Sequence, residues 1–299
     1  MIMSPNPVLK KLGLKNDDRV AIIHTDDIGM CQASVEAFTD LNEVGLISSG
    51  AVMVPCPWFL HAAGYARQHE KADLGIHLTL TSEWYTYRWG PISTRDPASG
   101  MMDEEGFFPH TSELTQKNGD PKAVEIELNA QIERAIQAGI VPTHMDTHMG
   151  TVAHPKFMGI YIQLAMKHRL PPMIFRMDET GWQAAGLEPE FAKMAAALVQ
   201  QLEASGLPLL DSIGGMKLDT DQNRLERTKR AFSDLQPGIT HFIIHPSKDT
   251  PELRAITPDW RCRAADYQNF MNEELRRHIQ EIGVNIIGYR ALKELMPGA

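Results

Sequence analysis

The chain has 299 residues, of which 43% are hydrophobic and 22% are charged, as in ordinary globular proteins. Its formal net charge of −9 comes without any block of basic residues, which disfavours nucleic acid and anionic membrane surfaces as partners. The three cysteines are scattered, so the sequence suggests neither a disulfide framework nor a cysteine zinc site. The polar start of the chain and the absence of a long apolar run lead us to expect a cytoplasmic protein with no membrane partner.

Short apolar runs that predict β-strands alternate with segments whose apolar spacing predicts helices. The predicted strands cover residues 20–24, 47–54, 74–80, 143–146, 173–177, 209–213, 241–245 and 285–288. The predicted helices cover residues 32–44, 57–70, 121–138, 155–168, 188–204, 220–235 and 263–282. This alternation indicates an α/β fold of parallel βαβ units in a single domain over residues 1–299, and eight strands is the number that closes a barrel. A doubly wound open sheet is the alternative, because periodicity does not separate the two.

One connection, at about residues 82–120, shows no clean periodicity and holds the aromatic residues Trp84, Tyr85, Tyr87 and Trp89. Long irregular segments inside compact domains are usually lids or binding loops. We therefore predict that this aromatic loop has a functional role.

Two adjacent carboxylates, Asp26 and Asp27, stand where the first predicted strand ends. The carboxyl ends of parallel strands are where α/β barrel enzymes keep their catalytic residues. Adjacent carboxylates repel each other, so the pair requires a nearby cation or a shared proton. A simpler interpretation is that the pair belongs to the N-terminus of the helix that begins near Gln32.

Two further strand ends carry histidines of the kind that binds metals. A catalytic divalent metal takes imidazole and carboxylate ligands from three protein residues and keeps one position open to water. Asp27, His77 and His148 could supply such a set, since strand ends converge at the mouth of a barrel. For His77 the alternative is a core histidine bonded to a backbone carbonyl.

The sharpest cluster is His144, Asp146 and His148, because alternation along a strand places these residues on one face. The sequence leaves open which of the two histidines would take the metal, and His144 or Asp146 could instead orient the ligands. His245 ends the seventh predicted strand, where it is either a catalytic residue or part of a turn. His24 alternates with apolar strand residues, and we expect it to be packed in the core.

The chain resembles the YdjC-like carbohydrate deacetylases through four motifs, which occur in the family's order over nearly the whole chain. They are Asp26-Asp27-Ile28-Gly29, Gly75-Ile76-His77-Leu78, His144-Met145-Asp146-Thr147-His148 and His245-Pro246. The resemblance implies an irregular (β/α) TIM-like barrel related to polysaccharide deacetylases, a metal bound by Asp27, His77 and His148, and Asp26 as the general base. The chain departs from the family at Met149-Gly150-Thr151 and at His24-Thr25, and both departures concern the rim of the site and hence the substrate.

The leading hypothesis is metal-dependent hydrolysis of an N-acetyl group on an amino sugar or short oligosaccharide. One divalent metal ion, with zinc and magnesium as the first candidates, would polarise the amide carbonyl and activate a water molecule. Asp26 would accept the proton of the water, and His245 would protonate the leaving amine.

The same hypothesis gives roles to residues around the site. Trp84, Tyr85 and Tyr87 would pack against the sugar, and Arg176 would bridge to Asp26 or to the substrate. One alternative is a metal-dependent phosphoesterase or sugar isomerase in which Arg88 or Arg176 contacts a phosphate, and another is a non-catalytic carbohydrate-binding protein. The predicted partner is a small carbohydrate, and a homodimer is compatible with the sequence, which leaves the sugar, its length and the metal open.

Overall fold

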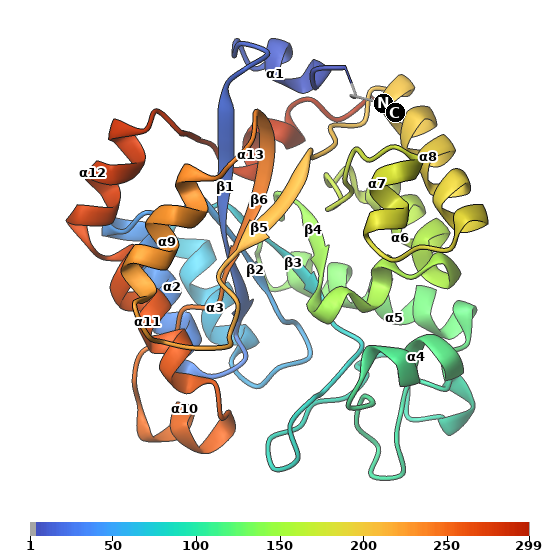
Figure 1. The fold of residues 1–299 in the computed structure, drawn as a ribbon. Helices are drawn as coiled ribbons and strands as arrows, with labels where there is room; N and C mark the ends of the chain where they lie inside the picture. The colour runs from blue at the N-terminus through green and yellow to red at the C-terminus, as the bar shows by residue number, and fades with distance from the viewer. Residues whose placement is uncertain (1–3, 299) are drawn as a thin grey trace.

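The computed structural model describes residues 4–298, with parallel strands at the centre and helices around them (Figure 1). The strands are β1 (Arg19–Ile28), β2 (Ser49–Val52), β3 (Leu74–Leu78), β4 (Met145–Thr147), β5 (Ser212–Gly215), β6 (Gly238–Ile244) and β7 (Asn285–Ile286). Every strand pairing assigned within the described residues is parallel, as the predicted βαβ units require.

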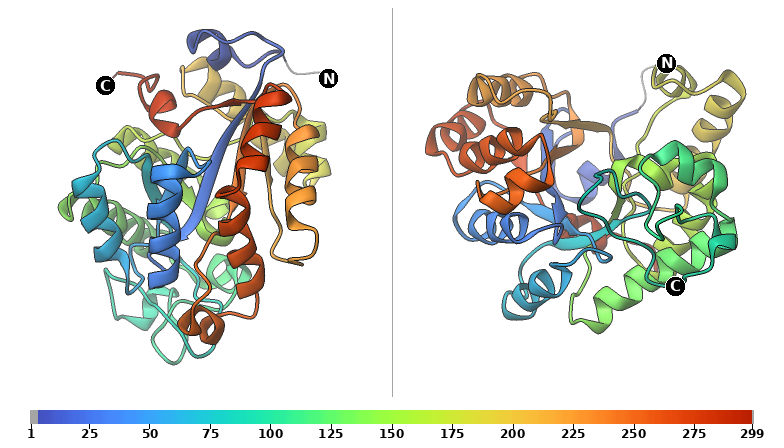
Figure 2. Two further views of the ribbon diagram at one scale, coloured as in Figure 1. Left: turned by 90° about the vertical axis from the view of Figure 1, so that its left-hand side faces the viewer. Right: turned by 90° about the horizontal axis from the view of Figure 1, so that it is seen from below.

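The helices pack around these strands, as the view from below shows (Figure 2). Those before β5 are α1 (Pro7–Lys11), α2 (Gln32–Val44), α3 (Phe59–Gln68), η1 (Pro97–Ser99), α4 (Ser112–Asn118), α5 (Pro121–Gln137), η2 (His148–Ala153), α6 (Pro155–His168), α7 (Glu179–Ala184) and α8 (Pro189–Ala204). Those after β5 are α9 (Arg224–Ser233), α10 (Pro251–Ile256), α11 (Trp260–Phe270), α12 (Glu273–Glu281) and α13 (Tyr289–Lys293). Within the described chain, no helix combines the length and the apolar character needed to cross a membrane.

The sheet has the strand order β4-β3-β2-β1-β6-β5, and β7 pairs with the start of β1. Its two outer strands are joined through residues 172–175, which make a parallel bridge from Pro172 to Met145 and another from Phe175 to Leu210. Together these pairings form a curled, irregular (β/α) barrel, so the predicted fold class is confirmed.

The fifth predicted strand, at residues 173–177, is therefore only partly correct. Its residues stand between β4 and the approach to β5, yet they form isolated bridges and no regular ladder. Within this segment the Ile174 N–H donates to the Pro172 carbonyl two residues back, so the chain turns locally and the ladder is interrupted.

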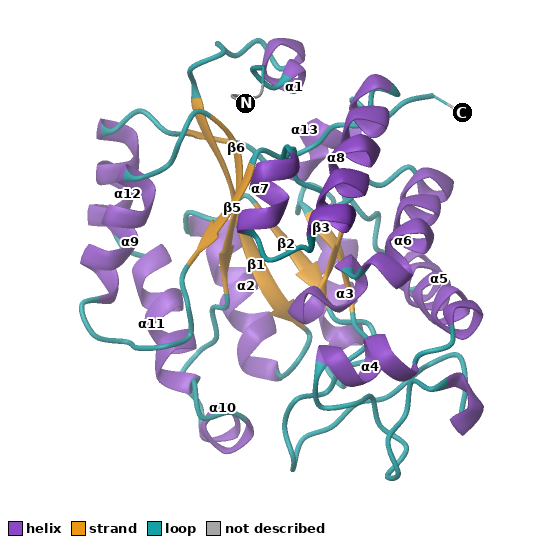
Figure 3. Cartoon of the chain, turned by 45° about the vertical axis from the view of Figure 1, so that its right-hand side comes forward, coloured by secondary structure: helices purple, strands orange, loops and turns teal. Residues whose placement is uncertain are grey.

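Two further predictions, one of a helix and one of an irregular segment, differ from the structure. The predicted helix at 263–282 is two helices, α11 and α12, separated at Asn272, whose side chain accepts a hydrogen bond from the backbone N–H of Glu274 and so begins a new helix. The predicted irregular segment at 82–120 contains α4, which starts at the N-cap Thr111. Apart from the short helix η1, the rest of this segment extends below the strand ends as loops (Figure 3).

Strand β1 explains how the barrel interior becomes polar at one end. Alternation places Val20, Ile22, His24 and Asp26 on the same face of this strand. Val20 and Ile22 pack with Leu210, Ile239 and Tyr289 in an apolar cluster near the start of the strands. The same face then continues into His24 and Asp26, which are both buried. The interior is thus apolar near the start of the strands and carries histidine and aspartate toward their C-terminal ends.

Candidate active site

A local irregularity in β1 presents two successive carboxylates at its C-terminal end. The pairing of β1 with β2 changes register between Thr25 and Ile28, and Asp27 has a φ of 61°, in the left-handed region. Consecutive residues of a regular strand point to opposite faces, whereas a register irregularity re-aims one side chain. Both carboxylates therefore face the same group of histidines.

Three of these side chains form a small triangle. Asp27 Oδ1 lies 3.5 Å from His77 Nε2 and 3.2 Å from His148 Nδ1, and the two nitrogens are 3.3 Å apart. Ligand atoms at about 2.1 Å from a tetrahedral zinc ion would be separated by about 3.4 Å. Moreover, Asp27 Oδ1 is buried and accepts no well-formed hydrogen bond from the described residues. The spacing and this unpaired oxygen both fit a divalent cation.

Each member of this triangle is held through its other polar atom by one neighbouring side chain. Asp146 Oδ1 accepts a hydrogen bond of 2.8 Å from His77 Nδ1, which leaves His77 Nε2 free to bind a metal. Glu83 Oε2 lies 3.1 Å from His148 Nε2. The Arg263 guanidinium donates to Asp27 Oδ2 at 2.7 Å.

No sequence pattern assigned a role to Glu83 or Arg263. Glu83 follows the β3 motif by only a few residues, which is a weak local signal for a neighbour of the site. Arg263 lies on α11, far along the chain from Asp27, and no local pattern could have connected these two residues.

The charges around Asp27, His77 and His148 favour a proton or a cation bound between these residues. Burial alone would raise the pKa of Asp27, but the charge of Arg263 and the nearby nitrogens of His148 and His77 hold that pKa well below its usual value. Burial would lower the pKa of His148, but Glu83 and Asp27 raise it to about 9. The pKa of His77 is also raised, because the charges of Asp146 and Asp26 outweigh its burial. Without a metal, the two histidines therefore hold protons in its place.

Asp26 lies beside the triangle without belonging to it. Its Oδ2 is 3.8 Å from His77 Nε2 and 3.8 Å from His245 Nε2. Burial would raise the pKa of Asp26, but the charge of His77 and a hydrogen bond from His24 outweigh this effect and lower it. Asp26 is thus an ionised carboxylate that faces both the triangle and His245. The His245 side chain is 22% exposed, so the outer part of this group reaches solvent.

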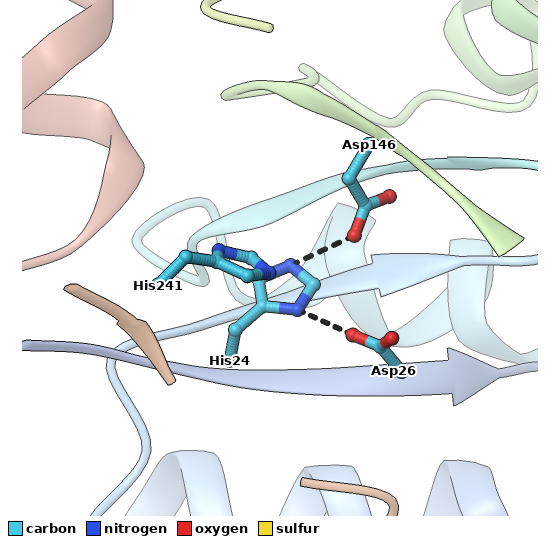
Figure 4. A group of neighbouring side chains, drawn as sticks. All are labelled: His24, Asp26, Asp146 and His241. Carbon is cyan, nitrogen blue, oxygen red and sulfur yellow. Dashed lines mark hydrogen bonds and ion pairs between the residues drawn. The ribbon is translucent and has the colours of Figure 1, made fainter. Parts of the chain in front are cut away.

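A second group of titratable side chains lies deeper in the barrel and consists of His24, Asp26, Asp146 and His241 (Figure 4). All four are buried. His24 Nδ1 is 2.7 Å from Asp26 Oδ1, and His24 Nε2 is 2.8 Å from His144 Nε2. His24 is therefore buried, as expected, but it hydrogen-bonds polar partners rather than packing among apolar side chains.

The sequence left open whether His144 or His148 belongs with Asp27 and His77. His148 faces Asp27 and His77, whereas His144 stacks on the ring of Tyr289 at 3.8 Å and contacts His24. Of the three residues on this predicted face, His148 lies in the triangle and Asp146 supports it.

The aromatic loop does not place its three candidate residues equally. The Tyr87 hydroxyl donates to the Met30 carbonyl at 2.6 Å, and the half-buried Trp84 packs edge-on against Trp89. Tyr85 is 82% exposed and contacts the ring of His110. Among these residues, Tyr85 is the one with a ring largely open to solvent.

Arg176 does not reach the site. Its guanidinium pairs with Glu203 and Asp211 and donates to the Ser4 carbonyl. It lines a cavity that includes Gly238, the first residue of β6, whereas His245 follows the last residue of that strand. The predicted bridge from Arg176 to Asp26 is therefore wrong, because the backbone of Arg176 pairs with Leu210 ahead of β5 and leaves the side chain at the opposite end of the barrel.

Comparisons with known proteins agree with this architecture. The chain is 32% identical to a carbohydrate deacetylase of Thermus thermophilus, over 97% of this chain and 99% of that protein. It is 22% identical to a carbohydrate deacetylase of Thermoanaerobacter pseudethanolicus, over 91% and 98% of the two chains. A crystal structure of an Enterococcus faecalis protein named for cellobiose-phosphate cleavage superposes with a TM-score of 0.73 at 23% identity, over 92% of this chain and 99% of that one. This last likeness shows the shared fold.

A family model described as YdjC-like protein matches residues 20–281. This range includes all four sequence motifs and every residue of the triangle. The chain therefore belongs to the YdjC-like protein family.

Proposed function

We propose that this protein is a metal-dependent carbohydrate deacetylase that removes the N-acetyl group of an amino sugar or short oligosaccharide. The observation that carries the proposal is the triangle of Asp27, His77 and His148, with its unpaired buried oxygen, beside the separate carboxylate of Asp26. The relatives named as carbohydrate deacetylases support the reaction class.

A divalent metal held by Asp27, His77 and His148 would supply a polarised amide carbonyl and a water of lowered pKa. Asp26 then accepts a proton from the attacking water, since it is ionised and faces the triangle. His245 donates a proton to the amide nitrogen, so that the products are a neutral amine and acetic acid, which loses its proton to become acetate. Asp26 Oδ2 lies within 3.8 Å of His245 Nε2, close enough for the acid and the base to act on one substrate.

The donor atoms also bear on the metal. Imidazole nitrogens suit zinc and other transition ions, whereas magnesium prefers oxygen ligands. With two nitrogens and one oxygen, we expect the triangle to bind zinc more tightly than magnesium.

The phosphoesterase and isomerase alternatives lose support from the positions of their arginines. Arg88 pairs with Asp103 and Glu105 inside the aromatic loop, and Arg176 lies at the far end of the barrel. Neither guanidinium is available to a phosphate at the site. A non-catalytic binding protein, in turn, would have no use for an acid, a base and a metal triangle together.

The test is acetate release from a panel of N-acetylated amino sugars and short oligosaccharides, using protein stripped of metal and then reloaded with zinc, manganese or magnesium. We expect acetate only from the reloaded protein. If the metal-free protein released as much acetate as the reloaded protein, the reaction would not depend on a metal. No release with any metal and any sugar of the panel would refute deacetylation.

A further inference from the structure

The deeper group of His24, Asp26, Asp146 and His241 resembles a second metal centre in composition. Its geometry differs from that of the triangle, where the ligand atoms are 3.2 to 3.5 Å apart and Asp27 Oδ1 is unpaired. In the deeper group, contacts of 2.7 and 2.8 Å join His24 to Asp26 and to His144. These distances are those of hydrogen bonds, and both ring nitrogens of His24 are already occupied by them. One feature still favours a cation, because His241 Nε2 is buried without a partner among the described residues.

The hydrogen bond to Asp26 has a defined direction. The proposed mechanism needs Asp26 as an ionised base, and an ionised carboxylate can only accept hydrogen bonds, so in that mechanism His24 Nδ1 carries the proton and donates to Asp26 Oδ1. This bond occupies one oxygen of Asp26 and turns the other, Oδ2, toward His77 and His245. The orientation of Asp26 thus depends on the position of the His24 ring.

Three aromatic side chains from different parts of the barrel surround the His24 ring and hold it in place. His144, from the residue before β4, contacts His24 Nε2 and stacks on Tyr289 of α13 at 3.8 Å. The Tyr289 hydroxyl hydrogen-bonds His241 Nδ1 at 2.8 Å, and the His241 ring lies 4.5 Å from the His24 ring. All four rings are completely buried. Such a packed set leaves His24 one position.

We propose that His24 is a positioning residue for Asp26, and that the deeper group is a hydrogen-bonded support of the general base rather than a second metal centre. The proposal rests on the proposed deacetylase function, in which Asp26 accepts the proton of the attacking water. Its consequence is that the distance of Asp26 Oδ2 from the reacting water is set by a side chain that touches neither metal nor substrate.

Two substitutions of His24 distinguish the roles of its two ring nitrogens. The amide nitrogen of asparagine stands where imidazole Nδ1 stands, and that of glutamine stands where Nε2 stands. His24→Asn therefore keeps a donor for Asp26 and loses the contact with His144, whereas His24→Gln does the reverse. We expect kcat to fall about 10- to 100-fold in His24→Gln, with KM and metal content unchanged, and His24→Asn to recover most of that loss. Equal kcat in the two variants, or wild-type kcat in His24→Gln, would overturn the proposal.

Two measurements on the wild-type holoenzyme test the geometry without any variant. Nitrogen-15 NMR of the imidazoles should show a proton on His24 Nδ1, and metal analysis with zinc should give one ion per chain. An unprotonated His24 Nδ1, or two tightly bound zinc ions, would contradict the positioning role. If the wild-type protein releases no acetate, the deacetylase function fails instead. If the wild type is active and His24→Gln has the same kcat, only the positioning role of His24 is refuted.

Discussion

At the scale of single residues, the adjacent carboxylates Asp26 and Asp27 have opposite surroundings. Asp27 contacts a guanidinium and two histidine nitrogens, while Asp26 Oδ1 is bonded to His24 and its Oδ2 faces His77 and His245. The register change in β1 makes this division possible, since it brings neighbours in sequence to different partners on one face.

The first prediction separates the two carboxylates. Asp27→Asn should lose the metal, because an amide oxygen is a weaker ligand, and it should keep the fold, because asparagine tolerates the left-handed φ of 61°. Asp26→Asn should retain metal and lose activity about 10²- to 10⁴-fold, because an amide does not accept the proton. Metal analysis and acetate release on both purified variants read this directly. Loss of metal in both would make Asp26 a ligand as well.

A second prediction concerns Glu83, which holds His148 through its Nε2. Glu83→Ala should raise the metal Kd about 10- to 100-fold, as loss of a neighbour that orients a ligand typically does. The matched control is Glu83→Gln, whose side-chain carbonyl still accepts from His148, and its Kd should stay closer to wild type. Competition with a chelator measures both constants. Identical Kd values for alanine and wild type would show that Glu83 has no part in metal binding.

At the scale of elements, the aromatic loop is a structured segment rather than a free one. Arg88 connects separate parts of this loop, because it pairs with Asp103 and donates to the Phe108 carbonyl. Thr115 of α4 donates to the Leu80 carbonyl just after β3. These bonds hold the loop against the end of the barrel and leave Tyr85 at its surface.

The third prediction compares two tyrosines of this loop. Tyr85→Ala should raise KM about 3- to 10-fold, the range expected for one aromatic contact, with no change in metal content. Tyr87→Phe, which removes the hydroxyl bonded to Met30, should leave KM unchanged and lower the free energy of unfolding by about 1 kcal/mol. Steady-state kinetics on a substrate that the wild type deacetylates, together with denaturant unfolding, measure both effects. A wild-type KM in Tyr85→Ala would exclude this ring from substrate binding.

At the scale of the whole molecule, the barrel contains several buried carboxylates, and their negative charge has to be balanced by protons or a cation. In the triangle, metal and protons compete for the same positions, because His77 and His148 have raised pKa values when no metal is bound. This competition ties metal binding to pH.

The fourth prediction follows from that competition. Metal ligands must be deprotonated, and the pKa of His148 in the metal-free site is about 9. A raised pKa means that the proton is held below pH 9, so metal affinity should rise with pH up to about that value. Near pH 7 we expect about two protons to leave per metal bound, one from each histidine. Calorimetric titration with zinc in buffers of different ionisation enthalpy counts these protons. A pH-independent Kd between pH 6 and 8 would contradict the assignment of the triangle as the metal site.

Much of this molecule follows from local sequence patterns. The apolar run before Asp26 predicted a buried strand, and the positions of His77 and His148 at strand ends predicted side chains that converge at the mouth of the barrel. Alternation also predicted that Asp146 and His148 share a face. These features depend on residues a few positions apart, which is the range over which periodicity and propensity act.

Tertiary structure alone decided the rest. It placed Arg176 at the end of the barrel opposite the candidate site. It also brought Arg263 to Asp27 and His144 to His24, residues separated by 236 and 120 positions in the chain. Such pairs depend on how strands and helices close around one another, and the energy of each contact arises only when burial brings both partners together.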